Sequence, residues 1–358
     1  MPDSLGFRDA LVGLPEQIEA AFRRLTVTGP LPDHDDIANV LVLGTGAAGW
    51  VGDLLAAVAG PFMPVPLLVH KGFAPPSFVD PTTLVVAISA SGNAPETVAS
   101  AAICVEAGAQ LFAVTSGGRL GALADSTESP TVFLPVAEGP THVPPRARIG
   151  ALAVPVLTTF ERLGFFPGGR EWIAAAIAQL RIRREELLAP GGLAHHLAGE
   201  LSGTMPLVYG GSAVGRAAAI RWKDQINQSA KSPAWVGVLP DVVHGELAGW
   251  GQHGDITRQI LSLVLLRHDE EPPEVSEQFD QVEEWTQEVM VGIHTVQAAG
   301  EGALAQLLDL AFVGDLVALD LAERYGIDPG PTPVLTGSPD PSDPPAPAGP
   351  APAPVVEA

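Results

Sequence analysis

The stretch LVVAISASGNAPET, Leu84 to Thr97, joins an apolar run typical of a buried strand to a helical pattern through a polar turn. Pro95 stands where the first turn of that helix is expected, a position that tolerates proline. Ser89 and Ser91 place hydroxyl donors in the turn, and Gly92 would allow a ligand to approach the backbone closely. These residues equally fit an ordinary serine-capped helix start. The stretch predicts a strand, a turn and a helix, with an anion site as one interpretation of the turn.

Strands and helices alternate along the rest of the chain, which is typical of parallel sheets covered by helices. Strands are expected at residues 40–43, 66–69, 84–88, 111–114, 132–134, 205–209, 260–266 and 291–296. Helices are expected at residues 7–25, 147–163, 171–188, 214–228 and 302–324, and between most of the early strands. The fold class is therefore α/β, with two tandem units of similar plan.

The expected organisation has five parts. They are an N-terminal helical segment at 1–35, a first unit at 36–168, a linking helix at 169–191, a second unit at 192–330 and a tail at 331–358. The tail is dominated by Pro and Ala and should be disordered.

Composition excludes several classes of partner. The 358 residues carry 41 acidic against 19 basic side chains, a net charge of −22, which argues against nucleic acid and anionic membranes as partners. The single cysteine, Cys104, permits no internal disulfide and no multi-thiolate metal site. The N-terminus does not resemble a signal peptide, and 260–266 is the longest apolar run noted, too short to span a membrane. A cytoplasmic protein without a metal centre is expected.

A glycine pattern at Gly44, Gly46 and Gly49 follows the first strand and matches the dinucleotide-binding fingerprint. That interpretation requires an acidic residue at the end of the second strand, where His70 and Lys71 stand instead. A nicotinamide cofactor stays an alternative, whereas a glycine-rich turn beside a serine-rich turn fits a sugar phosphate better. No cofactor is predicted.

The two turns, with Ser116-Gly-Gly118 after the fourth strand, resemble the sugar isomerase (SIS) domain. The second unit narrows the resemblance through the runs 207–212, 221–231, 239–250, 314–322 and 326–329. Together these runs are similar to the bifunctional phosphoglucose/phosphomannose isomerase family. The resemblance implies two SIS domains, a homodimer with sites near the subunit interface, and interconversion of glucose or mannose 6-phosphate with fructose 6-phosphate through an enediol.

The resemblance assigns catalytic roles to particular positions. Gln228 stands where the family has its glutamate base, and an amide cannot act as a general base. His244 matches the ring-opening histidine, and Arg146 matches the arginine that stabilises charge. A late lysine of the family is missing, because the last lysine here is Lys231. Glu246 is a candidate substitute base.

The family's phosphate cradle corresponds to two groups of residues in this chain. They are Gly46, Ala47 and Ala48 in the first turn, and Ser89, Ser91 and Ala94 in the second. Two of the family's hydroxyl donors are absent from these positions. Two hypotheses follow, a working isomerase with a relocated base and a non-catalytic phosphosugar sensor or regulator.

Each further candidate has a structural alternative. Arg221 and Lys223 fit a solvated helix face, and Trp222 fits the core. His244 alone would fit a capping or interface histidine. The pair His195-His196 is expected at the surface, since adjacent helical residues diverge. The run 33–36, Asp-His-Asp-Asp, is expected to be a loop, with a cation site as the alternative.

Overall fold

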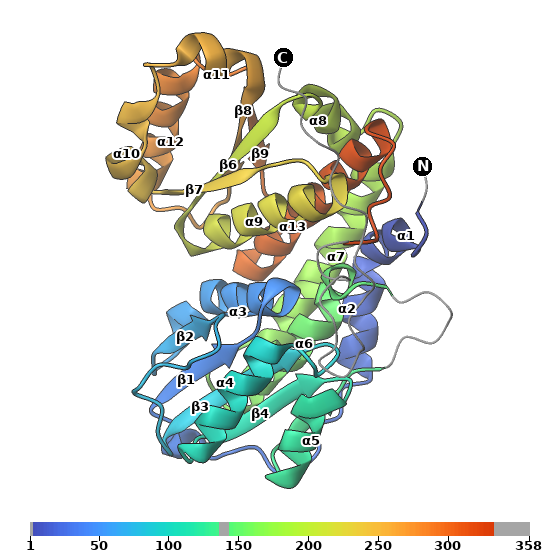
Figure 1. The fold of residues 1–358 in the computed structure, drawn as a ribbon, viewed down its shortest axis with the longest axis vertical. Helices are drawn as coiled ribbons and strands as arrows, with labels where there is room; N and C mark the ends of the chain where they lie inside the picture. Colours follow the sequence, from blue (N-terminus) through green and yellow to red (C-terminus); the bar gives the residue numbers. More distant parts are fainter. Residues whose placement is uncertain (1–2, 136–142, 333–358) are drawn as a thin grey trace, which may run out of the picture.

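A computed structural model describes residues 3–135 and 143–332 as two parallel α/β units (Figure 1). The α/β fold class predicted from the sequence is confirmed. The predicted tail lies, from residue 333 onward, outside the described residues.

The first sheet has five parallel strands in the order β2-β1-β3-β4-β5. They are β1 (Asn39–Leu43), β2 (Leu67–His70), β3 (Thr83–Ser89), β4 (Gln110–Thr115) and β5 (Thr131–Phe133). Its helices are α3 (Gly46–Val58), α4 (Pro95–Glu106) and α5 (Gly118–Ser126). All five predicted strands are confirmed to within a residue or so. Cys104 is buried in α4, and this burial raises the pKa of its thiol to about 11.

The second sheet has four parallel strands in the order β7-β6-β8-β9. They are β6 (Met205–Gly211), β7 (Trp235–Leu239), β8 (Leu261–Arg267) and β9 (Ile293–Gln297). The helices of this unit are α8 (Leu193–Leu201), α9 (Ser212–Gln225), α10 (Asp241–Gly245), α11 (Gly254–Ile260) and α12 (Pro273–Thr286). The sequence analysis missed β7, a half-buried edge strand whose pattern is interrupted by Gly237. It also extended α9 too far, because a π-helical turn, Ile226–Ala230, follows Gln225.

Five further helices of the described chain lie outside the two sheets' own crossover connections. They are α1 (Phe7–Val12), α2 (Leu14–Arg23), α6 (Ile149–Arg162), α7 (Gly169–Leu188) and α13 (Gly302–Arg324). The helical stretch expected at 7–25 is helical as far as Arg23, and it is divided at Gly13 into α1 and α2. The expectation that no segment reaches membrane-spanning length is wrong, because α13 is long and apolar enough. Protein surrounds it nevertheless: 89% of its most apolar window is buried within the fold.

One hydrophobic core joins the two units. It contains Val42 and Leu54 of the first unit, Ala217 and Val264 of the second, and most of α13. Figure 1 shows α3 facing α9 across this junction, and the Trp50 indole N–H on α3 donates to the Ala217 carbonyl on α9 at 2.7 Å. The units are therefore packed as one body around α13.

Candidate functional site

A topological switch point lies between β1 and β3 in the first sheet. Helix α3 connects β1 to β2, on one side of β1 in the sheet. Helix α4 connects β3 to β4, in the opposite direction across the sheet. The two helices accordingly pack on opposite faces, since Leu54 of α3 and Val98 of α4 belong to separate hydrophobic clusters. Open parallel sheets bind ligands at such points, outside the carboxyl ends of the strands.

Both helices that begin at this switch point lack side-chain caps. Helix α3 follows Thr45 and α4 follows Ala94, and neither residue caps its helix with a side chain. The Ser91 hydroxyl instead accepts the backbone N–H of Asn93 at 3.2 Å, so the serine-capped interpretation of this turn is wrong. Because β1 pairs directly with β3, these two helix starts lie at the same edge of the sheet. Uncapped N–H groups there favour an anion.

The glycines of these turns serve packing within the protein. Gly92 has φ +73°, and a Cβ on it would lie 1.8 Å from the Gly117 carbonyl oxygen. The close approach predicted for a ligand at Gly92 is thus made by the chain itself. Likewise a Cβ on Gly49 would lie 2.7 Å from the Gly44 carbonyl oxygen. Close packing of α3 against the end of β1 therefore explains why Gly44 and Gly49 match the dinucleotide-binding pattern.

A buried charge cluster lies beside α3, where the two units meet. Arg221 on α9 is 2% exposed, and its Nε and Nη2 bind the two carboxylate oxygens of Asp315 on α13 at 2.7 and 2.8 Å. The Gln225 amide also donates to Asp315, at 2.8 Å. Arg221 donates in addition to the Arg146 carbonyl at 2.6 Å. The solvated face considered for Arg221 is therefore wrong, whereas Trp222 is buried as predicted.

Arg146 is held by the C-terminal part of the described chain. It lies in a 3-10 turn, Pro145–Ala147, that packs against α3, and its guanidinium stacks on Phe7 at 4.4 Å. Its Nη2 donates to the carbonyls of Pro329 and Gly330 at 2.5 and 2.7 Å, while Nη1 donates to the Thr332 hydroxyl at 3.1 Å. The Nε of Arg146 is buried without a partner among the described residues.

Lys231 extends this cluster. It ends the π-helical turn in the left-handed conformation, with φ +53°, and its Nζ donates to the carbonyls of Gln228 and of Pro331, the latter at 2.7 Å. Such turns recur at functional sites. Burial lowers the pKa of Lys231, with Arg146 adding to the effect and Asp328 opposing it. Burial also lowers the pKa of Arg146 to about 10, and Arg221 adds to that shift.

His244 and Glu246 do not belong to the cluster around Arg146 and Lys231. Both follow the carboxyl end of β7, whereas Gln228 precedes its amino end. The five residues of β7 alone span about 15 Å. Glu246 accepts the hydroxyl of Tyr209, and burial, followed by this bond, raises the pKa of that phenol. Within one chain, neither His244 nor Glu246 shares a site with Gln228.

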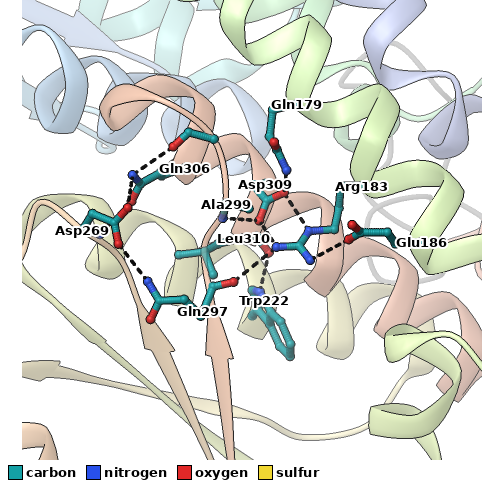
Figure 2. A network of polar contacts seen from close by, with 11 residues as sticks. Gln179, Arg183, Glu186, Trp222, Asp269, Gln297, Ala299, Gln306, Asp309 and Leu310 are labelled. Atoms are coloured by element: carbon teal, nitrogen blue, oxygen red, sulfur yellow. Dashed lines mark hydrogen bonds and ion pairs between the residues drawn. The ribbon is translucent and has the colours of Figure 1, made fainter.

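A second buried network has a structural role (Figure 2). Asp309 accepts Arg183 Nε at 2.8 Å and Nη2 at 2.7 Å, the Gln179 amide at 3.0 Å and a backbone N–H. Arg183 also binds Glu186 at 3.0 Å. The bonds between Arg183 and Asp309 join α7 to α13.

The remaining candidate residues lie outside the site described above. His195 and His196 are exposed, as predicted, and no group of three or more potential metal ligands occurs among the described residues. The run 33–36 forms a short 3-10 turn in which His34 contacts the Leu163 carbonyl. Lys223 pairs with its neighbour Asp224 at 2.7 Å.

Comparison with known proteins finds relatives that cover most of the chain. Residues 192–337 match the family described as the bacterial phospho-glucose isomerase C-terminal SIS domain. The bifunctional phosphoglucose/phosphomannose isomerase of Caldicellulosiruptor bescii is 29% identical over 90% of this chain and 95% of its own length. The enzyme of the same name from Aquifex aeolicus is 28% identical over 83% of this chain and 88% of its own.

This chain is a homologue of the bifunctional phosphoglucose/phosphomannose isomerases. The resemblance found in the sequence is thereby confirmed. Its fold is also that of the C-terminal domain of glucosamine-fructose-6-phosphate aminotransferase from Francisella tularensis, with a TM-score of 0.65 at 13% identity over 91% of this chain and 98% of that one.

The motifs that resemble the phosphoglucose/phosphomannose isomerases lie in two places in this homologue. One is the switch point of the first sheet and its surroundings, and the other follows the carboxyl end of β7, where His244 and Glu246 lie. The cradle positions, Gly46 to Ala48 and Ser89 to Ala94, line the switch point of the first sheet. Arg146 lies beside them, and the turn that carries Gln228 approaches Arg146 through Lys231. Sequence reasoning missed Asp315, Gln225 and Lys231 as parts of this cluster. The available signal for Asp315 was its place in the middle of a long apolar helix, because a carboxylate buried there needs a cationic partner.

Proposed function

We propose that the chain binds a sugar 6-phosphate at the switch point between β1 and β3. The supporting observation is the pair of uncapped helix N-termini, α3 and α4, that open at this one edge of the sheet. Helix N-termini bind phosphate through backbone N–H groups and the helix dipole, and this does not require the hydroxyls that the cradle has lost. Ser89 and Ser91 add two hydroxyl donors.

The sugar carbons would extend from the phosphate toward Arg146 and Gln228. Arg146 lies in a turn packed on α3, and Arg221 stacks near Trp50, one helical turn after the start of α3. Aldose–ketose isomerisation at this position requires a base, and losing a general base typically costs ~10²–10⁴ in rate. Gln228 therefore favours a second candidate function, a phosphosugar sensor without turnover.

A homodimer and a cytoplasmic location belong to the same proposal. His244 lies far from Gln228 within one chain, so a contribution of this histidine to the site requires a second copy. The composition, with one cysteine and a strongly acidic balance, supports the location.

Binding is tested by proton NMR of fructose 6-phosphate in D₂O with the purified protein. We expect line broadening that fructose without phosphate does not show. Ser91→Asp should abolish it by charge repulsion at the cradle, whereas Ser126→Asp, exposed at the end of α5, should not. Unbroadened fructose 6-phosphate signals with the natural protein would contradict the proposal.

The same samples separate the two functions. Loss of the C1 or C2 proton signal by exchange with solvent in the natural protein supports an isomerase with a base elsewhere. Exchange only in a Gln228→Glu variant supports the sensor, because the site would then bind the sugar but lack the base.

A further inference from the structure

A cavity with a volume of about 390 Å³ lies at the β5 edge of the first sheet, between α2 and the start of α6. The two helices lie side by side in Figure 1 and pack against each other. Volumes of about 300–1,000 Å³ are usual for small-molecule sites. None of the cradle positions lines this cavity. Most of its wall is aliphatic, from Ala20, Ala21, Val132, Leu134, Ala151 and Pro155. The cavity therefore has the size and the wall of a site for an apolar group.

Two arginines, Arg24 after α2 and Arg148 before α6, also line the cavity. The Nη2 of Arg148 donates to the Pro135 carbonyl at 2.9 Å, and within residues 3–135 and 143–332 neither arginine forms an ion pair with a carboxylate. The acidic residues nearest on α2, Glu16 and Glu19, pair with arginines outside the cavity. Burial lowers the pKa of Arg148, and no acidic group opposes that shift. The wall thus carries two positive charges that the described chain does not neutralise.

Gln17 of α2 adds a third polar group to the wall. Its amide nitrogen donates to the carbonyls of Ala10 and Ala147, the latter at 2.8 Å, and these two bonds fix the orientation of the amide. Its Oε1 is buried and has no partner among the described residues. A buried acceptor without a donor costs free energy. This wall is therefore incomplete without a group that the described chain does not supply.

The wall selects the chemistry of that group. A small polar anion would leave the aliphatic surface of α2 and α6 in contact with water, and a pure hydrocarbon would leave Arg148 without a partner. A guanidinium matches a carboxylate in shape, and hydrogen bonds between ionised partners are about twice as strong as neutral ones. A ligand with an aliphatic body and a carboxylate end satisfies both parts of the wall.

We infer that this cavity is a second ligand site, which binds an amphipathic monocarboxylate with its aliphatic body between α2, β5 and α6 and its carboxylate on Arg148 and Arg24. The site does not depend on the phosphosugar site. It lies behind the turn Pro145–Ala147, since Gln17 in the cavity wall holds the carbonyl of Ala147.

The inference is tested by calorimetric titration of the full chain with octanoate, octan-1-ol and octylammonium as probes. We expect octanoate to bind at least about tenfold more tightly than octan-1-ol, because only the carboxylate forms charge-assisted bonds with the arginines. Octylammonium should bind more weakly than both, since the two guanidinium groups repel it.

Matched variants locate the ligand. Arg148→Gln should reduce the preference for octanoate over octan-1-ol to below about threefold, whereas Arg162→Gln, exposed at the other end of α6, should retain it. Ala151→Phe fills the cavity and should abolish binding of both probes. Ala107→Phe, at the exposed end of α4, should not. Thermal melting of each variant confirms folding.

Each outcome decides the inference. Equal binding of octanoate and octan-1-ol overturns it, as does a preference that Arg148→Gln leaves unchanged. If neither probe binds, the cavity is filled by protein, from this chain or from a second copy, and the inference fails. Octanoate should still bind to Ser91→Asp, which blocks the proposed phosphate cradle. Loss of octanoate binding in that variant would place the carboxylate at the switch point and overturn a separate site.

Discussion

Asp315 shows how one buried side chain organises its neighbours. Its carboxylate accepts three hydrogen bonds, and burial raises its pKa while Arg221 opposes that shift. Arg221 in turn holds the Arg146 carbonyl, so the position of Arg146 depends on Asp315 through one intermediary. Asp315, on α13, is thus a positioning residue for Arg146 at the edge of the first unit.

At this scale we predict that Asp315→Ala lowers the free energy of unfolding by about 3–5 kcal/mol, because it leaves the Arg221 charge buried without a partner. Urea unfolding monitored by circular dichroism measures the loss. Asp255→Asn, which removes an exposed partner of Arg258, should change little and is the control. Equal effects of the two substitutions would show that the Arg221 pair is not stabilising.

At the scale of the element, the turn after β3 depends on its contact with the turn after β4. The Ser116 hydroxyl donates to the Ala90 carbonyl, and the backbone N–H of Leu120 donates to the Gly92 carbonyl at 2.9 Å. Gly92 packs directly against the Gly117 carbonyl. The two turns hold each other in place, and this fixes the start of α4 at the switch point.

We therefore predict that Gly92→Ala costs about 2–5 kcal/mol of stability, the sum of left-handed strain and overpacking, and weakens fructose 6-phosphate binding. Gly6→Ala is the matched control, because Gly6 has a similar φ of +62° but open space around its Cα. It should cost only the strain, ~1–2 kcal/mol. Denaturant unfolding of both variants tests the difference, and an equal cost would argue against steric packing at Gly92.

At the scale of the whole molecule, the shared core predicts that the two units unfold together. Helix α13 packs against α7, α8 and α9, and the Trp50 bond joins α3 to α9. Calorimetry should record a single transition. Two resolved transitions would mean that the units are thermodynamically separate despite this core.

The hydrogen bond from Trp50 to the Ala217 carbonyl tests how much the contact between α3 and α9 stabilises the molecule. Trp50→Phe removes this bond and replaces a buried indole by a smaller ring, and it should lower the free energy of unfolding by about 1–3 kcal/mol. Trp285→Phe, at an exposed position of α12, should leave it unchanged. Denaturant unfolding with both variants measures the difference.

The sequence by itself determined most of the strands and the similarity to the isomerases. Apolar runs bounded by turn residues fixed the five strands of the first sheet and three of the second, because buried parallel strands have a strong local signature. The edge strand β7 and the acidic helix α12 lacked that signature and were missed. The ordered motifs in both units gave the relationship to the isomerases without any coordinates.

Only the tertiary structure decided which residues meet. Arg221 and Asp315 are 94 positions apart, and Arg146 reaches carbonyls more than 180 residues further along the chain. Periodicity reports which face of an element is apolar, and not which distant element covers it. The sequence therefore could not show that Arg221 is buried, that Glu246 lies at the opposite edge from Gln228, or that Arg146 and Lys231 share the segment at 329–332. Those contacts exist because α13 brings the end of the chain back between the two sheets.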